Sequence, residues 1–146
     1  MSNADEGGRE INSMLGNYAK LHKDRILCVK SLGSIRYLSA MKYCEFVMGN
    51  SSSGIIEAPS FGIPTINIGD RQRGRIKADS IIDCSPEKED ILRAINKALS
   101  PSFRLHCKEV INPNGDGNTS KRIISIIKEY SDSHEIDLKK KFYNII

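Results

Sequence analysis

The stretch FVMGNSSSG at residues 46–54 decides the fold. Its first three residues form a short apolar run that is typical of a buried strand, and a glycine-flanked polar loop follows at once. Residues 55–60 have the pattern of a short helix ended by FGIP, and residues 65–68 predict another strand. A strand, a loop, a helix and a second strand in this order indicate one βα unit of a parallel sheet.

The same alternation continues on both sides of this unit. Amphipathic spacing predicts helices at residues 10–22, 34–44, 87–99 and 120–130, and short apolar runs predict strands at 25–30 and 80–84. The helix at 10–22 should bury one apolar face. The fold class is therefore α/β with a parallel sheet. We interpret the polar, lysine-rich residues 131–146 as a tail or docking segment after a folded domain of residues 1–130.

The composition fits one globular domain, because 39% hydrophobic side chains in 146 residues are enough for one core. The formal charge of +4 is modest, and an aromatic content of 6% leaves few rings for base stacking, so nucleic acid is not expected as a partner. No apolar stretch is long enough to cross a bilayer, and the amino terminus lacks a signal-peptide profile. We expect a cytoplasmic protein with no membrane partner.

The residues that usually hold metals or redox groups do not occur in the required patterns. The four cysteines are isolated, the three histidines show no metal spacing, and neither a Walker-type GKS or GKT nor a GxSxG elbow is present. The turn-rich residues 112–118 resemble a calcium loop only superficially, and we interpret them as a cap of the last helix. No metal and no cofactor are expected, and isolated thiols suit a reducing cytosol.

The polar loop after the first strand of the unit has two interpretations. GNSSSG places backbone N–H groups and three hydroxyls at the start of a helix, where unpaired donors and the helix dipole favour an anion such as a diphosphate. The structural alternative is that serine and asparagine cap the helix and glycine forms the turn. Glu57 either compensates the dipole or accepts hydrogen bonds from ribose hydroxyls.

Two other loops follow predicted strands, at the edge where open parallel sheets bind ligands. GDRQRGR at residues 69–75 brings three arginines together, and guanidinium groups suit bidentate binding of phosphate oxygens. A solvated charge run and an RNA-binding patch are the alternatives. The backbone of KSLGS at residues 30–34 could bind a base, with Tyr37 as an apolar face, although a tyrosine at such a position is more often part of the core.

Taken together, these motifs resemble those of one enzyme family. NAD at 3–5, GNSSSGIIEA at 49–58, FGIPTINIG at 61–69, RQRGR at 71–75 and GDGN at 115–118 occur in the order found in the hydrolysing UDP-N-acetylglucosamine 2-epimerases of sialic-acid biosynthesis. The resemblance covers residues 3–130. It implies a glycosyltransferase-B-type architecture, in which two Rossmann-like domains close over UDP-N-acetylglucosamine, and it makes this chain an amino-terminally truncated form of the second, UDP-binding domain.

The resemblance also implies substrate-binding roles for eight residues. The phosphates would contact the polar loop and Arg71, the ribose Glu57, the uracil the backbone near Leu32, and the N-acetyl sugar the first residues of the chain. The eight are Asn3, Leu32, Tyr37, Ser51, Ser52, Gly54, Glu57 and Arg71.

In this family UDP leaves by anti-elimination across C1 and C2 of the sugar, and water then adds to give N-acetylmannosamine. The resemblance implies UDP and UDP-N-acetylglucosamine as partners, with no metal or redox cofactor. Because the family's acidic catalytic residues lie in the amino-terminal domain, the chain is expected to be inactive by itself. Sheet edges left exposed by truncation would favour homo-oligomers.

Three alternatives stay open. The chain could be the UDP-sugar-binding domain of a glycosyltransferase of the same architecture, or a stand-alone nucleotide-sugar-binding module. An RNA-binding module that uses Arg71, Arg73 and Arg75 would instead show a steep salt dependence and indifference to free UDP.

Overall fold

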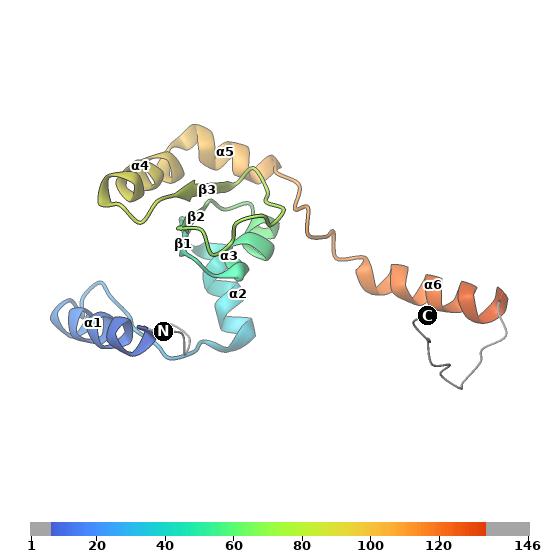
Figure 1. Ribbon diagram of the computed structural model, residues 1–146, viewed down its shortest axis with the longest axis horizontal. Coiled ribbons are helices and arrows are strands. Elements are labelled where there is room, and N and C mark those ends of the chain that lie inside the picture. Colours follow the sequence, from blue (N-terminus) through green and yellow to red (C-terminus); the bar gives the residue numbers. More distant parts are fainter. Residues whose placement is uncertain (1–6, 134–146) are drawn as a thin grey trace, which may run out of the picture. The chain divides into compact units, whose positions relative to one another are not determined.

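A computed structural model describes residues 7–133 of the chain (Figure 1). The chain divides into two compact units, Met1–Glu45 and Phe46–Ile146, and each is described by itself. Asn3 and most of the predicted tail lie outside the described residues.

The first unit contains two helices, α1 (Gly8–Leu21) and α2 (Gly33–Tyr43), close to the bounds predicted from apolar spacing. The expectation of a buried face on α1 is wrong, because Met14 and Tyr18 are 65% and 54% exposed and the buried residues of the helix are Gly8 and Ala19. The described part of this unit has no sheet against which an apolar helix face could pack, so amphipathic spacing here does not lead to burial.

The second unit is built on a parallel sheet of three strands. β1 (Val47–Gly49), β2 (Thr65–Ile68) and β3 (Ile81–Cys84) lie in the order β1-β2-β3. Met48 of β1 pairs with Ile66, and Ile66 pairs with Ile82 on β3. This arrangement confirms the predicted α/β class with a Rossmann-like parallel sheet.

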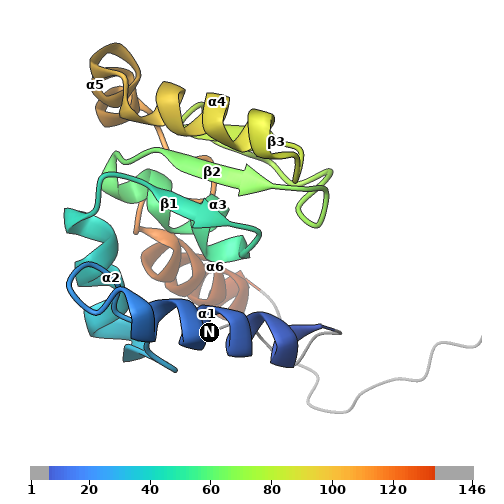
Figure 2. The same cartoon turned by 90° about the vertical axis from the view of Figure 1, so that its left-hand side faces the viewer.

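Helices cover both faces of this sheet (Figures 1 and 2). α3 (Ser52–Ile56) and the 3-10 helix η1 (Ala58–Phe61) lie between β1 and β2 in the chain, and α3 contacts both strands. α4 (Lys88–Leu99) contacts β2 and β3 on the other face. The predicted helix at 55–60 thus becomes two shorter ones, because Pro59 lacks the N–H group that a continuing α-helix would need.

The main core lies between the sheet and α4. Ile66 and Ile82 of the sheet pack with Ala94 and Ala98 of the helix, and Phe103 borders this cluster. Alanine at both helix positions lets α4 approach the strands closely, since neither side chain extends beyond Cβ. Burial of such apolar surface, at roughly 25 cal/mol per Å², is the main term that stabilises this layer.

Residues 26–30 form no strand in the described part of the chain, so the prediction of a strand at 25–30 is wrong. An extended segment becomes a strand only when a neighbouring strand pairs with its backbone. In the described residues the sheet consists of β1, β2 and β3 alone. Apolar composition therefore identified a segment that could form a strand, but it could not show that no partner strand lies beside it in the described residues.

Two further helices follow α4. The sequence patterns did not predict α5 (Pro101–Glu109), whose start is marked by Ser100 as a cap and Pro101 in the first turn. α6 (Thr119–Ser133) extends three residues beyond its predicted end, and none of its residues is buried. No helix within residues 7–133 combines the length and apolarity that crossing a membrane would require.

Candidate functional site

Two polar loops begin at the same edge of the sheet. The first, here called the serine loop, is Gly49–Gly54 after β1, and the second, the arginine loop, is Gly69–Arg75 after β2. Since β1 and β2 are parallel and Gly49 is in register with Asn67, both loops leave the carboxyl ends of adjacent strands. This is the edge at which parallel α/β sheets bind ligands.

Gln72 joins the two loops. Its side chain is 4% exposed, and its Nε2 donates a hydrogen bond to the backbone oxygen of Asn50 at 2.8 Å. The arginine loop therefore lies beside the serine loop. The Oε1 atom of Gln72 is buried and has no hydrogen-bond partner within residues 7–133, so it is an available acceptor at this junction. The arginines drew the sequence interpretation to this motif, and the glutamine between them was missed.

The serine hydroxyls divide between structural and available roles. The Ser51 hydroxyl accepts from the Ser53 N–H at 3.3 Å, which is the capping interaction of the structural interpretation, and the Ser53 hydroxyl donates to the Glu57 carboxylate. The Ser52 hydroxyl has no hydrogen-bond partner in the described part of the chain. Ser52 thus has both its donor and its acceptor positions free for a ligand, and the Ser51 hydroxyl, which only accepts here, keeps its donor.

The helix after the serine loop is too short for the dipole argument. α3 has five residues, and the Gly54 N–H already donates to the Ser51 carbonyl at 3.2 Å. A macrodipole is the sum of aligned peptide dipoles, so little more than one turn contributes little of it. The expected cluster of free N–H groups is therefore only partly present. Anion binding at this edge would depend more on the hydroxyl and guanidinium groups of the two loops.

Gly54 itself is buried against β2. A Cβ at this position would lie 2.9 Å from Cγ2 of Thr65, and the Thr65 hydroxyl donates to the Gly54 carbonyl at 2.8 Å. Close packing of α3 on the sheet is thus a structural reason for glycine here. A phosphate contact at Gly54 stays a prediction.

Glu57 lies at the end of α3 and not near its beginning. It is the last, capping residue of α3 and directly precedes η1, and its side chain does not cap η1. A carboxylate at the carboxyl end of a helix is unfavourable for the dipole, so the interpretation of Glu57 as a compensating charge is wrong. Its exposed carboxylate, oriented by Ser53, retains free acceptor positions.

An ion pair between Lys77 and Asp83 holds the last part of the connection from β2 to β3. Lys77 Nζ lies 2.7 Å from Asp83 Oδ1, which also accepts from the Asn67 amide at 2.6 Å. Burial acts to raise the pKa of Asp83, but the hydrogen bonds from Lys77 and Asn67 outweigh it and hold the pKa below its ordinary value. Sequence patterns do not reveal this network, because its members are 6 and 16 residues apart.

The remaining predicted ligands lie elsewhere. Leu32 and Tyr37 are half-buried residues of the first unit, next to and within α2. Their relation to the serine loop stays a prediction, and Asn3 is outside the described residues. Arg71 is exposed on the arginine loop, as are Arg73 and Arg75.

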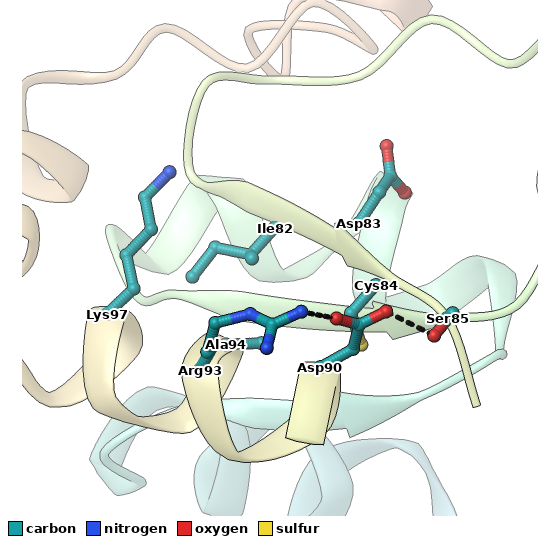
Figure 3. A pocket seen from close by; sticks show the side chains of 8 residues that line it. All are labelled: Ile82, Asp83, Cys84, Ser85, Asp90, Arg93, Ala94 and Lys97. Carbon is teal, nitrogen blue, oxygen red and sulfur yellow. Dashed lines mark hydrogen bonds and ion pairs between the residues drawn. The ribbon is translucent and has the colours of Figure 1, made fainter. Parts of the chain in front are cut away.

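Two cavities of the second unit lie away from the paired loops. One, of about 320 Å³, opens between the end of β3 and α4, where Asp90 binds both Ser85 and Arg93 (Figure 3). Cys84 also lines it, and burial, then the charge of Asp83, raises the pKa of this thiol. The other, of about 430 Å³, lies between η1 and the loop that precedes α6. Neither cavity contains a residue predicted to bind substrate.

The sequence is similar to those of known proteins. Residues 1–128 match the model of the family described as UDP-N-acetylglucosamine 2-epimerase. The chain belongs to this family. It is 40% identical over 144 residues to the polysialic acid biosynthesis protein P7 of Escherichia coli, and 46% identical over 103 residues to a GDP/UDP-N,N'-diacetylbacillosamine 2-epimerase (hydrolyzing) of Campylobacter jejuni.

These alignments cover 99% and 70% of the chain but 36% and 26% of the relatives, so the chain spans about a third of their length. A solved structure from Listeria monocytogenes with a provisional UDP-N-acetylglucosamine 2-epimerase designation matches 97% of the chain with a TM-score of 0.69. That match covers 38% of the other protein at 22% identity, and it supports the fold alone, including the predicted relation to part of a glycosyltransferase-B-type architecture.

Proposed function

We propose that the chain supplies the UDP-binding part of a hydrolysing epimerase that acts on UDP-N-acetylglucosamine or a closely related UDP-sugar. The observation that carries this proposal is the hydrogen bond from the buried side chain of Gln72 to Asn50, which joins the serine and arginine loops in a member of this family. A hydroxyl-bearing loop and a guanidinium-bearing loop at one sheet edge form a surface suited to a diphosphate.

Each group has a distinct task. Arg71 binds the diphosphate, the Ser52 hydroxyl donates a hydrogen bond to a phosphate oxygen, and Glu57 accepts hydrogen bonds from the ribose hydroxyls. Ser51 and Gly54 shape the same loop, with Leu32 and Tyr37 at the uracil and Asn3 at the sugar. No metal or redox cofactor is required for these contacts.

The chemistry of the reaction explains why arginine is suited to this position. UDP departs by anti-elimination across C1 and C2, so negative charge develops on the diphosphate while a proton leaves C2; water then adds to give N-acetylmannosamine. A preorganised guanidinium stabilises the leaving group in the transition state more than in the ground state. Proton abstraction falls to groups outside this subsite, and we expect the 146 residues alone to bind UDP without turning over the sugar.

The names of the relatives indicate which sugar the UDP carries. Relatives carry names that refer to UDP-N-acetylglucosamine and to UDP-N,N'-diacetylbacillosamine, which share UDP and differ in the hexose. The loops described above would contact the part common to both. We therefore assign the UDP portion to this chain and propose N-acetylglucosamine as the sugar, with its diacetamido relative as the alternative.

Two properties of the protein follow from the same proposal. The four cysteines are free thiols, which supports a reducing cytoplasmic location. β1 and β3 are the edges of the sheet in the described residues, and unpaired strand edges favour association, which supports a homo-oligomer. Sedimentation across a concentration series measures this, and a monomer at every concentration contradicts it.

Calorimetric titration of UDP into the chain and its variants tests the site. Arg71→Ala and Ser52→Ala should each weaken binding, Arg71→Ala by about tenfold or more, because a charge-assisted hydrogen bond is worth about 1.5–3 kcal/mol. Uridine, which lacks phosphate, should bind weakly to all forms. Arg104→Ala and Ser102→Ala, both at exposed positions on α5, are the matched controls and should bind like the unmodified chain. Equal UDP affinity in all five proteins, or no binding at millimolar UDP, contradicts the proposal.

A further inference from the structure

The loop that precedes α6 contacts α3, although more than fifty residues separate them in the chain. Asn112 Nδ2 donates to the Ile56 carbonyl at 2.9 Å and to the Ser60 hydroxyl at 2.7 Å. Asn114 Nδ2 donates to the Ile55 carbonyl at 3.3 Å. The sequence interpretation made this loop a cap for the last helix. Its two asparagines also cap the carboxyl end of a helix much earlier in the chain.

These contacts satisfy groups that α3 cannot satisfy by itself. The last carbonyls of any α-helix lack intrahelical partners, and in a five-residue helix they form most of the backbone. Asn112 is fixed at both ends of its amide, because its Oδ1 accepts from the Asn114 N–H at 2.9 Å while its Nδ2 donates to α3 and η1. The amide orientation is therefore set by the network.

Glu57 lies between the two groups that Asn112 holds. The Ile56 carbonyl belongs to the peptide bond that leads directly into Glu57, and Ser60 lies three residues later, where its N–H donates to the Glu57 carbonyl at 3.0 Å. The backbone on both sides of Glu57 is thus tied to one side chain. By contrast, the side-chain contact of the Glu57 carboxylate within α3 is the hydrogen bond from the Ser53 hydroxyl.

We propose that Asn112, assisted by Asn114, is a positioning residue that fixes Glu57 for recognition of the ribose. This inference rests on the proposed function, since it assumes that Glu57 accepts from ribose hydroxyls. Asn112 touches neither the nucleotide nor the sugar in this arrangement. It acts by holding the backbone at the junction of α3 and η1, which fixes the position of the Glu57 carboxylate.

The test compares UDP with 2′,3′-dideoxy-UDP, which lacks both ribose hydroxyls but keeps uracil and diphosphate. The unmodified chain should prefer UDP by about tenfold or more, as expected for hydrogen bonds to a carboxylate. Glu57→Gln should reduce this preference to about threefold or less. Asn112→Ala and Asn112→Asp, which cannot donate, should reduce it to the same degree, whereas affinity for the dideoxy nucleotide should stay within about twofold. Asn114→Ala should have a smaller effect.

A double variant and a matched control complete the design. Combining Glu57→Gln with Asn112→Ala should lower the preference no further than either change alone, because both remove the same contact. Asn96→Ala, at an exposed asparagine of α4, should keep the full preference. Asn112→Asp is close to isosteric, so it provides the measurement if the alanine variant does not fold.

The outcomes separate the two proposals. If Glu57→Gln keeps the preference for UDP, the ribose assignment in the proposed function is wrong. If Glu57→Gln loses the preference but the Asn112 variants keep it, Asn112 is not a positioning residue and the inference is overturned. Equal weakening of both nucleotides by Asn112→Asp would mean a general structural role, and it would overturn the inference as well.

Discussion

The serine loop and the arginine loop leave the same edge of the sheet, yet they are held in different ways. The serine loop is fixed by short-range bonds within itself and by the packing of Gly54 against Thr65 of β2. The arginine loop turns on its own backbone, with the Arg73 N–H donating to the Asp70 carbonyl at 2.8 Å, and is positioned by Gln72 reaching to Asn50. The sheet therefore places the serine loop. The arginine loop is held at its start by the Gly69 N–H, which donates to the Cys84 carbonyl of β3 at 2.9 Å, and further along by the serine loop.

This difference predicts that damage to the serine loop disturbs both loops. Gly54→Ala should have the largest effect, because the new methyl group would lie 2.9 Å from buried Thr65 Cγ2 and such overpacking costs about 1–3 kcal/mol of unfolding free energy. UDP affinity should fall with it. The measurement is urea unfolding followed by circular dichroism, with calorimetry of UDP on the folded variant.

Gly16→Ala is the matched control for this change. Gly16 is in the middle of α1, and a Cβ there meets nothing within 4 Å, so alanine should stabilise that helix by about 0.5–1 kcal/mol. If Gly54→Ala had the stability of the unmodified protein, Thr65 would be able to move away from the new methyl group at little cost. Packing against β2 would then not be what fixes the serine loop.

Breaking the link between the loops should affect ligand binding more than stability. Gln72→Leu removes the donor to Asn50 and should cost about 1 kcal/mol of stability, as for a typical hydrogen bond. UDP affinity should fall several-fold, because the arginine loop, which carries Arg71, would no longer be held beside the serine loop. Gln72→Met, which keeps the length of the side chain but not the donor, should behave alike. Unchanged UDP affinity in both variants would mean that the arginine loop finds its position without the serine loop.

The ion pair between Lys77 and Asp83 should make the smallest contribution to stability, and this contribution depends on pH. The folded-state pKa of Asp83 is lowered, so its ion pair with Lys77 stabilises the protein above the ordinary aspartate pKa and is lost as the pH falls through the folded value. Asp83 is 55% exposed, so the contribution is less than about 1 kcal/mol. Lys77→Met should lower stability at pH 7 and not at an acidic pH at which Asp83 is protonated, whereas Lys20→Met on α1 should show no such pH dependence. An equal loss for Lys77→Met at both pH values would exclude the ion pair as its cause.

The sequence predicted the elements of the second unit well because local patterns dictate them. Apolar runs gave β1, β2 and β3, amphipathic spacing gave α4, and the polar residues between strands gave both loops. α5 was missed because its apolar spacing is weak and its start depends on the single pair Ser100-Pro101. The strand at residues 25–30 and the buried face of α1 were wrong for one reason: both need a partner surface, and local patterns do not show that the described residues provide none.

By itself the sequence determined the α/β class, the family, and the two loops that carry hydroxyl and guanidinium groups, because motifs and periodicity are local properties of the chain. Only the tertiary structure decided that Gln72 joins those loops, that Glu57 ends its helix, and that Asn112 holds the backbone around Glu57. These contacts join residues 22 to 56 positions apart. Such pairs form only when parallel strands bring loops to one edge and short helices leave backbone groups for distant side chains to satisfy.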